Sequence, residues 1–140
     1  IDLPIEKVSF KTYENALGNL LVVNDKKCLI HSSIARKDSE IIRRVEDALD
    51  VEVVEFNCSY LILGTIMVAN NRGALVHPKL SDDEISFIEE TMKIKANRGT
   101  VNMGSPYVRT GLIANSYGFI VGLKTTGLEM QRIYDVLFRE

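Results

Sequence analysis

Two cysteines and two histidines are the residues of this 140-residue chain whose types could support covalent or acid–base chemistry. Cys28 lies inside an apolar run, which predicts a packed thiol, and Cys58 has no basic neighbour that would activate it as a nucleophile. His31 and His77 occupy equivalent places in two similar segments, and no third ligand stands at a useful spacing for a metal ion. We therefore expect strand-end histidines with ordinary hydrogen bonds, no catalytic residues, no metal site and no cofactor.

Composition narrows the class of protein further. The formal net charge is −2, with Lys and Arg scattered among Asp and Glu, which argues against a broad phosphate-binding surface. The cysteines lack CxxC spacing and suit a reducing compartment. No apolar run reaches the roughly 18 residues that a membrane span needs. We expect a cytoplasmic globular protein with no membrane partner and, since the chain opens on Ile1, part of a longer product.

The elements that position these side chains follow from an internal repeat. The segment from Asn24 to His31 returns 46 positions later as residues 70–77, and a weaker copy follows 45 positions on, at residues 115–122. A fixed period of this length is typical of one supersecondary unit copied along the chain.

Each copy predicts two short strands, a helix and a third strand. The strand pairs are residues 20–23 with 28–30, 66–69 with 74–76, and 112–114 with 119–121, each joined by a turn that begins at an asparagine. Gly73 and Gly118 would close two of these turns in a left-handed conformation. Ser81 with Glu84 and Thr126 with Glu129 predict capping boxes at two helix starts.

The remaining helix and the flanking strands complete a β-β-α-β unit. A helix beginning near Asp38 or Ser39 carries apolar residues at 41, 42, 45 and 49, and an extended stretch at 51–56 follows it. Residues 5–10 match that stretch at the same offset of 46 and predict the last strand of a preceding unit. The expected divisions are residues 1–13 as the end of a preceding repeat, then repeats at 14–58, 59–102 and 103–140, the last without its closing strand.

Four separated motifs then resemble the translation initiation factor 6 family. They are Asn15-Ala16-Leu17-Gly18-Asn19, Leu75-Val76-His77-Pro78-Lys79, Gly99-Thr100-Val101-Asn102-Met103-Gly104-Ser105 and Thr125-Thr126-Gly127-x-Glu129. The match covers nearly the whole chain, and the last motif is more similar to the archaeal form. The resemblance implies an α/β fold of the pentein type, a closed five-fold pseudosymmetric propeller, of which this chain would hold about three units.

The resemblance also implies a non-enzymatic function and a partner. The family binds the intersubunit face of the large ribosomal subunit, mainly through a ribosomal protein beside the sarcin–ricin loop and secondarily through rRNA. It sterically prevents association with the small subunit and accompanies large-subunit maturation. A full-length protein of this kind is expected to be a monomer.

Candidate contact residues come from the glycine-polar steps that open the first strand of each repeat, Gly18-Asn19 and Gly64-Thr65. In the resemblance, the docking surface includes the asparagine of the Ala-Leu-Gly-Asn motif, which is Asn19 here, and we extend it to the segment 102–108. Pro106 and Tyr107 depart from the family's pattern. Glycine at such a step has a second explanation, since it also permits a tight backbone approach. The expected ribosome-binding residues are Leu17, Gly18, Asn19, Gly64, Thr65, Asn102, Gly104, Ser105 and Val108.

Two other classes of protein remain open at this point. Other pentein proteins are guanidine-modifying enzymes with a late catalytic cysteine preceded by a histidine, whereas here neither residue type occurs after His77. The second alternative is a structural fragment that cannot bind because its ring is open.

Overall fold

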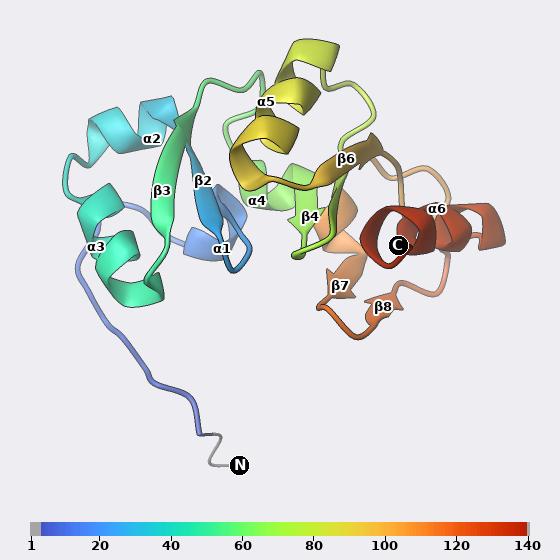
Figure 1. Ribbon diagram of the computed structural model, residues 1–140, viewed down its shortest axis with the longest axis horizontal. Coiled ribbons are helices and arrows are strands. Elements are labelled where there is room, and N and C mark those ends of the chain that lie inside the picture. Colours follow the sequence, from blue (N-terminus) through green and yellow to red (C-terminus); the bar gives the residue numbers. More distant parts are fainter. Residues whose placement is uncertain (1–3, 140) are drawn as a thin grey trace.

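The computed structural model describes residues 4–139 and lays them out as a row of alternating helices and sheets (Figure 1). The helices are α1 (Leu17–Leu20), α2 (Ser32–Lys37), α3 (Ile41–Leu49), α4 (Leu63–Ile66), α5 (Asp82–Met92) and α6 (Gly127–Leu137), with a 3₁₀ turn η1 (Val108–Thr110). The strands are β1 (Leu21–Val23), β2 (Lys27–His31), β3 (Glu52–Phe56), β4 (Met67–Ala69), β5 (Gly73–Val76), β6 (Lys95–Arg98), β7 (Leu112–Ala114) and β8 (Phe119–Val121).

These strands form three separate sheets. In the first, β1 pairs antiparallel with β2, and β2 pairs parallel with β3. The second sheet repeats this arrangement with β4, β5 and β6. The third contains the antiparallel pair β7–β8. The parallel pairing in the first two sheets requires a crossover, which α2 and α3 provide in one case and α5 in the other.

Alternation of side chains along the strands explains the layered core. On β2, Cys28 and Ile30 pack with α3 in one apolar cluster, whereas Leu29 points to the opposite face and packs with Ile88 and Met92 of α5. On the second sheet, Leu75 packs in the same way with α6. The order of layers is therefore α3, first sheet, α5, second sheet, α6, third sheet.

The prediction of a closed pentein-type propeller is wrong for this chain. Within residues 4–139 the sheets are two mixed three-stranded sheets and one two-stranded sheet, and no strand pairing joins the first sheet to the last. The physical reason is that the helices and sheets stack in one direction, so the first layer, α3, and the last layer, β7–β8, lie at opposite ends of the row. The row thus ends in a helix, α3, on one side and in a sheet, β7–β8, on the other.

Residues 5–10, predicted as a strand, form none, and residues 5–9 are exposed. The matching segment, β3, is a strand because it pairs with β2 along its whole length, and the described chain offers residues 5–10 no equivalent partner. The structure also adds α2, which the sequence did not predict. Its N-cap is His31, whose Nδ1 accepts a hydrogen bond from the Ser33 amide at 3.0 Å.

The asparagine turns form, but not by the predicted glycine conformation. In each turn the asparagine Oδ1 accepts from the amides two and three residues later, at 2.8–3.0 Å. The left-handed prediction for Gly73 and Gly118 is wrong, because Gly104 is the one glycine of the described residues with positive φ. Gly73 is needed for space, since a Cβ there would lie 1.9 Å from the Val136 carbonyl oxygen.

Candidate functional site

Three short helical turns, α1, α4 and η1, gather at one end of the layered row. Each turn directly precedes the first strand of its sheet, so the repeated order of elements places all three at the same end. The turn α4 packs against α1 on one side and against η1 on the other (Figure 1). The predicted glycine-polar steps lie in these helical turns and not in strands, which corrects the expected secondary structure.

On α1, the structure exposes Gly18 and Asn19, with Leu17 half-buried. The turn begins at Ala16, whose φ of 52° is left-handed, and the Asn19 amide donates to the Ala16 carbonyl at 2.8 Å. The Asn19 side-chain amide makes no hydrogen bond to any residue in the range 4–139. It is therefore available to an external partner.

On α4 and η1, two predicted contact residues are buried. A Cβ on Gly64 would lie 2.1 Å from the Gly18 carbonyl oxygen, so this glycine allows the backbones of α1 and α4 to approach. Val108 is fully buried in the cluster around α6. Thr65 is half-buried beside Gly64. For Gly64 and Val108, the geometry supports packing within the chain.

The loop 101–105 lies at the same end, after β6. Asn102 is half-buried with φ 49°, and its side chain occupies the space beside Gly111 and Gly122, where Cβ atoms would lie 2.5 and 2.2 Å from it. Ser105 exchanges two backbone hydrogen bonds with Val101, at 2.7 and 3.0 Å. Gly104 is exposed with φ 100°, a conformation that favours glycine.

Two capping-box glutamates anchor the loops of this end. Glu129 caps α6 with Thr126 and also accepts hydrogen bonds from Thr100 Oγ1 at 2.7 Å, the Gly104 amide at 2.8 Å and the Met103 amide at 3.2 Å. Burial raises the pKa of this carboxyl, but the hydrogen bonds outweigh burial and hold the pKa at about 2.

Glu84 performs the corresponding role for the loop before α4. It caps α5 with Ser81 and accepts from the Ser59 amide at 2.6 Å. Burial acts to raise its pKa, and the hydrogen bonds from Ser59 and Ser81 lower it to about 2. Both capping boxes were predicted from the sequence and are confirmed, whereas the second use of each glutamate was not predicted.

Exposed apolar side chains flank the three turns; Met103 and Tyr107 lie in the segment 102–108 that the sequence analysis included, whereas Leu61 and Ile62 were missed by it. Their exposed fractions lie between 39% and 73%. We call them, together with Asn19, the docking face: Asn19, Leu61, Ile62, Met103 and Tyr107. Apolar residues in loops next to a buried strand were the available signal, but the sequence alone does not separate them from core residues.

The histidines take ordinary structural roles, as predicted. His31 Nε2 lies 2.9 Å from the Cys58 carbonyl oxygen. His77 Nδ1 accepts from the Lys79 amide at 3.1 Å, and its ring contacts Tyr60 and Tyr107 with centroids 4.4 and 5.7 Å away. Burial, with a smaller contribution from the Lys79 charge, lowers the pKa of His77.

Both cysteines are buried and unpaired by disulfides. Burial raises the pKa of Cys28 to about 12 and that of Cys58 to about 11. A nucleophilic cysteine needs the opposite shift, because the thiolate is the reactive form. Among residues 4–139 no group of three His, Cys, Asp or Glu side chains could hold a metal ion.

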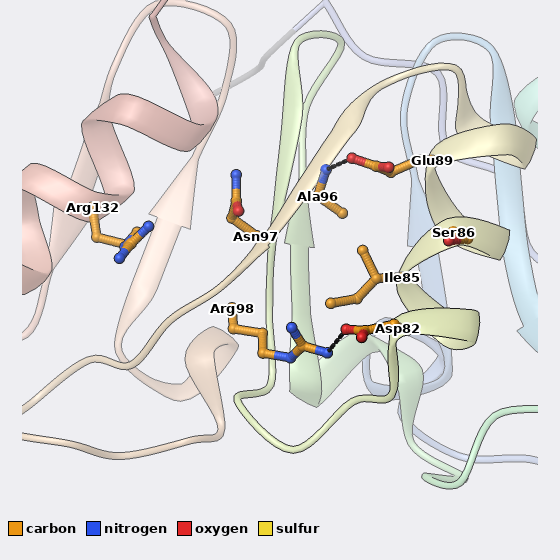
Figure 2. Close-up of a pocket in the computed structure, with 8 residues that line it drawn as sticks. All are labelled: Asp82, Ile85, Ser86, Glu89, Ala96, Asn97, Arg98 and Arg132. Carbon is orange, nitrogen blue, oxygen red and sulfur yellow. Dashed lines mark hydrogen bonds and ion pairs between the residues drawn. The ribbon is translucent and has the colours of Figure 1, made fainter.

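A polar cleft of about 400 Å³ lies between α5, β6 and α6 (Figure 2). Arg98 pairs with Asp82 at 2.7 Å and donates to the Leu80 carbonyl, and Glu89 accepts from the Ala96 amide at 3.0 Å. Arg132 faces the cleft from α6. Because the carboxylates of Asp82 and Glu89 are both engaged in structural contacts, the cleft contains no evident acid–base pair.

None of the helices in the described part of the chain has the length and the apolar character that crossing a membrane requires.

Comparisons with known proteins agree with the whole-chain pattern of motifs. A sequence model of the eIF-6 family matches residues 2–136. A protein of Pyrococcus abyssi named translation initiation factor 6 is 41% identical over 133 residues, which are 94% of this chain and 57% of that protein. The protein of the same name from Thermoplasma acidophilum is 37% identical over 124 residues, covering 88% and 56%.

The chain thus spans a little more than half the length of the relatives it matches. The matched range nevertheless includes all three sheets, the helical turns and both glutamate-anchored loops. On this evidence, the chain belongs to the eIF-6 family.

Proposed function

We propose that this protein binds the large ribosomal subunit at its intersubunit face, sterically prevents association with the small subunit and takes part in large-subunit maturation. The observation that carries the proposal is the match of the eIF-6 family over residues 2–136. The names of the relatives from Pyrococcus and Thermoplasma support a role in translation initiation.

The composition of the docking face supports a protein as the main partner. Its exposed side chains are uncharged, and aromatic and methionine side chains are enriched at the centres of protein interfaces. Asn19 adds a side-chain amide that can both donate and accept. We propose a large-subunit ribosomal protein beside the sarcin–ricin loop as the docking partner.

Basic residues at the same end support secondary contacts with rRNA. Lys79 follows the end of β5, Arg109 lies in η1, and Lys124 follows the end of β8, and all three are exposed. Three cations suit a few phosphate contacts and not a continuous nucleic-acid surface.

We also propose that the protein acts without catalysis, in the cytoplasm, and as a monomer when the polypeptide has its relatives' length. The burial and raised pKa of both cysteines argue against a guanidine-modifying enzyme, whose chemistry uses a cysteine nucleophile. Incubation with arginine should yield no citrulline, and measurable turnover would overturn this part of the proposal.

The decisive experiment is co-sedimentation with separated ribosomal subunits. We expect the protein to sediment with the large subunit and not with the small one. Asn19→Ser should weaken binding about tenfold, because it removes an amide able to form hydrogen bonds at an interface. Asn97→Ser is the matched control, since Asn97 is exposed on β6 in the cleft, away from the docking face.

Each outcome of this experiment decides a separate point. Equal binding by the Asn19→Ser and Asn97→Ser proteins would remove Asn19 from the contact surface. Sedimentation of the unaltered protein with neither subunit would overturn the proposed function. Circular dichroism of both variants checks that the fold is intact.

A further inference from the structure

His77 leaves one ring nitrogen without a partner, although the residue is only 3% exposed. Its Nδ1 accepts from the Lys79 amide at 3.1 Å, whereas no residue in the range 4–139 forms a hydrogen bond with its Nε2. Buried polar atoms normally have a partner, because little water reaches them. A buried nitrogen left in this state costs stability unless a ligand satisfies it.

The unused nitrogen carries the proton of the ring. Because a backbone amide donates to Nδ1, that nitrogen has no proton of its own. Burial, with a smaller contribution from the Lys79 charge, lowers the pKa of His77, so the ring is neutral at pH 7. A neutral imidazole has one N–H group, which is therefore on Nε2. The atom without a partner is a hydrogen-bond donor.

This donor is accessible from outside. Within residues 4–139, the one fully enclosed side-chain nitrogen or oxygen atom that lacks a hydrogen bond belongs to Glu14. His77 Nε2 also lacks a hydrogen bond, so it is not fully enclosed. Since the whole residue is 3% exposed, the opening to the ring is narrow. An acceptor can reach Nε2 from one direction while the rest of the ring stays packed.

The first repeat uses the equivalent donor within the chain. His31 occupies the place of His77, and its Nδ1 accepts from the Ser33 amide at 3.0 Å. The His31 ring therefore has the same tautomer, and its Nε2 donates to the Cys58 carbonyl oxygen at 2.9 Å. The two histidines are held alike at Nδ1 and differ in the partner of Nε2.

The carbonyl that corresponds to Cys58 is already occupied in the second repeat. Val53 and Ala96 hold equivalent places in β3 and β6. Cys58 follows the first of them by five residues, and Val101 follows the second by five. The Val101 carbonyl accepts from the Ser105 amide at 2.7 Å. This loop thus takes the acceptor that the first repeat gives to its histidine, and it leaves the second histidine free to donate elsewhere.

The free donor lies beside the docking face. The His77 backbone amide donates to the carbonyl of Ile66, the last residue of α4, at 2.9 Å. The ring contacts Tyr60, which directly precedes the docking-face residues 61–62, and Tyr107, which is itself part of the face. The two loops that supply most of the docking face therefore meet at this ring.

From these features we infer that His77 belongs to the docking site and that its Nε2–H donates a hydrogen bond to a backbone carbonyl oxygen of the partner protein. A neutral donor in contact with aromatic rings matches an uncharged acceptor, and a backbone carbonyl is the acceptor that any protein segment offers. The inference rests on the proposed function, because the partner is the large-subunit ribosomal protein proposed there.

The first test is co-sedimentation with large ribosomal subunits. His77→Asn keeps an acceptor at the place of Nδ1 for the Lys79 amide but removes the donor at Nε2, and it should weaken binding about tenfold. His77→Gln places its NH₂ group near the position of Nε2 and should restore most of the affinity. Circular dichroism at the assay temperature checks that each variant is folded.

His31→Asn is the matched control, because it makes the same change where the donor bonds within the chain. It should lower the melting temperature and leave binding unchanged. Equal binding by the unaltered protein and His77→Asn would overturn the inference and leave the proposed function intact. An equal loss of affinity in His31→Asn, or in His77→Gln, would also overturn it, because the loss would then come from packing. Failure of the unaltered protein to sediment would overturn the proposed function itself.

The second test needs neither ribosomes nor a substitution at position 77. A long-range ¹H–¹⁵N NMR spectrum of the chain at pH 7 identifies which nitrogen of each histidine ring carries the proton. The chain has two histidines, so the His31→Asn protein leaves the signals of His77 alone. We expect a neutral ring with the proton on Nε2. A proton on Nδ1 would overturn the inference whatever the sedimentation shows, since Nε2 could then not donate.

Discussion

Glu129 offers the most quantitative prediction, because one carboxylate holds both a helix start and a loop of the docking face. Its Oε1 accepts from Thr100 and Gly104, and its Oε2 accepts from Met103 and Thr126. Glu129→Gln keeps the size of the side chain, removes the charge and replaces one acceptor oxygen with an NH₂ group. At least two of the groups that now donate to the carboxylate would then face the NH₂ group, which is itself a donor.

The magnitude follows from the pKa. The folded value of about 2, against an ordinary 4.5, corresponds to about 3 kcal/mol of stabilisation at neutral pH, as an upper bound. Because the folded pKa is the lower one, this contribution is complete above pH 5 and is lost as the pH falls towards 2. At pH 3, a little more than 1 kcal/mol of it should remain.

The assay is urea unfolding followed by circular dichroism, on both proteins at pH 7 and at pH 3. We expect Glu129→Gln to lower the free energy of unfolding by about 3 kcal/mol at pH 7 and by about 1 kcal/mol at pH 3. Glu84 titrates over the same range, but it is present in both proteins and cancels in the difference. Glu90→Gln is the matched control, because Glu90 is exposed on α5, and its effect should stay within about 0.5 kcal/mol.

Two results would refute this reasoning. The first is a stability difference between the Glu129 protein and its glutamine variant that does not change between pH 7 and pH 3. The second is an equal effect of Glu129→Gln and Glu90→Gln at pH 7, which would mean that the four hydrogen bonds to Glu129 do not depend on the ionised carboxylate.

Three further predictions concern packing, the turns and the thiols. Gly64→Ala should lower the melting temperature, at a cost of about 2 kcal/mol or more, because its Cβ would meet the Gly18 carbonyl at 2.1 Å; Gly18→Ala, which has open space, should change it little, and equal melting would contradict the close approach. Asn70→Ala should cost about 3 kcal/mol in urea unfolding, because its side chain forms two bonds within its turn and two to the next unit, and a loss below about 1 kcal/mol would show that these bonds add little. Native Cys28 and Cys58 should react with a disulfide reagent at pH 8 far more slowly than in urea, since burial raises their pKa to about 12 and about 11, and a fast native reaction would be inconsistent with that burial.

The local features of this fold were predictable because each has a short-range physical cause. A hydroxyl three residues before a glutamate satisfies helix amides whatever lies elsewhere, so the boxes at Ser81 and Thr126 were found from sequence alone. The antiparallel strand pairs were found because the chain repeats their apolar pattern at a fixed offset.

The features that failed depend on distant contacts. Four-residue helices such as α1 and α4 are too short to show a helical period, so they were taken as strand starts. A glycine next to a polar residue has the same sequence signature whether it faces a partner, as Gly18 can, or its own chain, as Gly64 does. The closed propeller was implied by the family resemblance and not by any local pattern, and within residues 4–139 no strand pairing joins the first sheet to the last.

The anchoring glutamates connect stability with binding in a way that can be separated experimentally. Most of the docking face is built from loops, yet the loops at Ser59 and at Met103–Gly104 are tied to helix starts by the carboxylates of Glu84, which is half-buried, and Glu129, which is buried. A face held in this way does not need to be ordered on binding, which lowers the entropic cost of association. Asn19→Ser should therefore weaken binding to large subunits without changing the unfolding free energy, whereas Glu129→Gln should lower both the binding affinity and the unfolding free energy, although Glu129 itself is buried. If Glu129→Gln lowered stability and left binding unchanged, the loop at residues 102–105 would not belong to the binding surface.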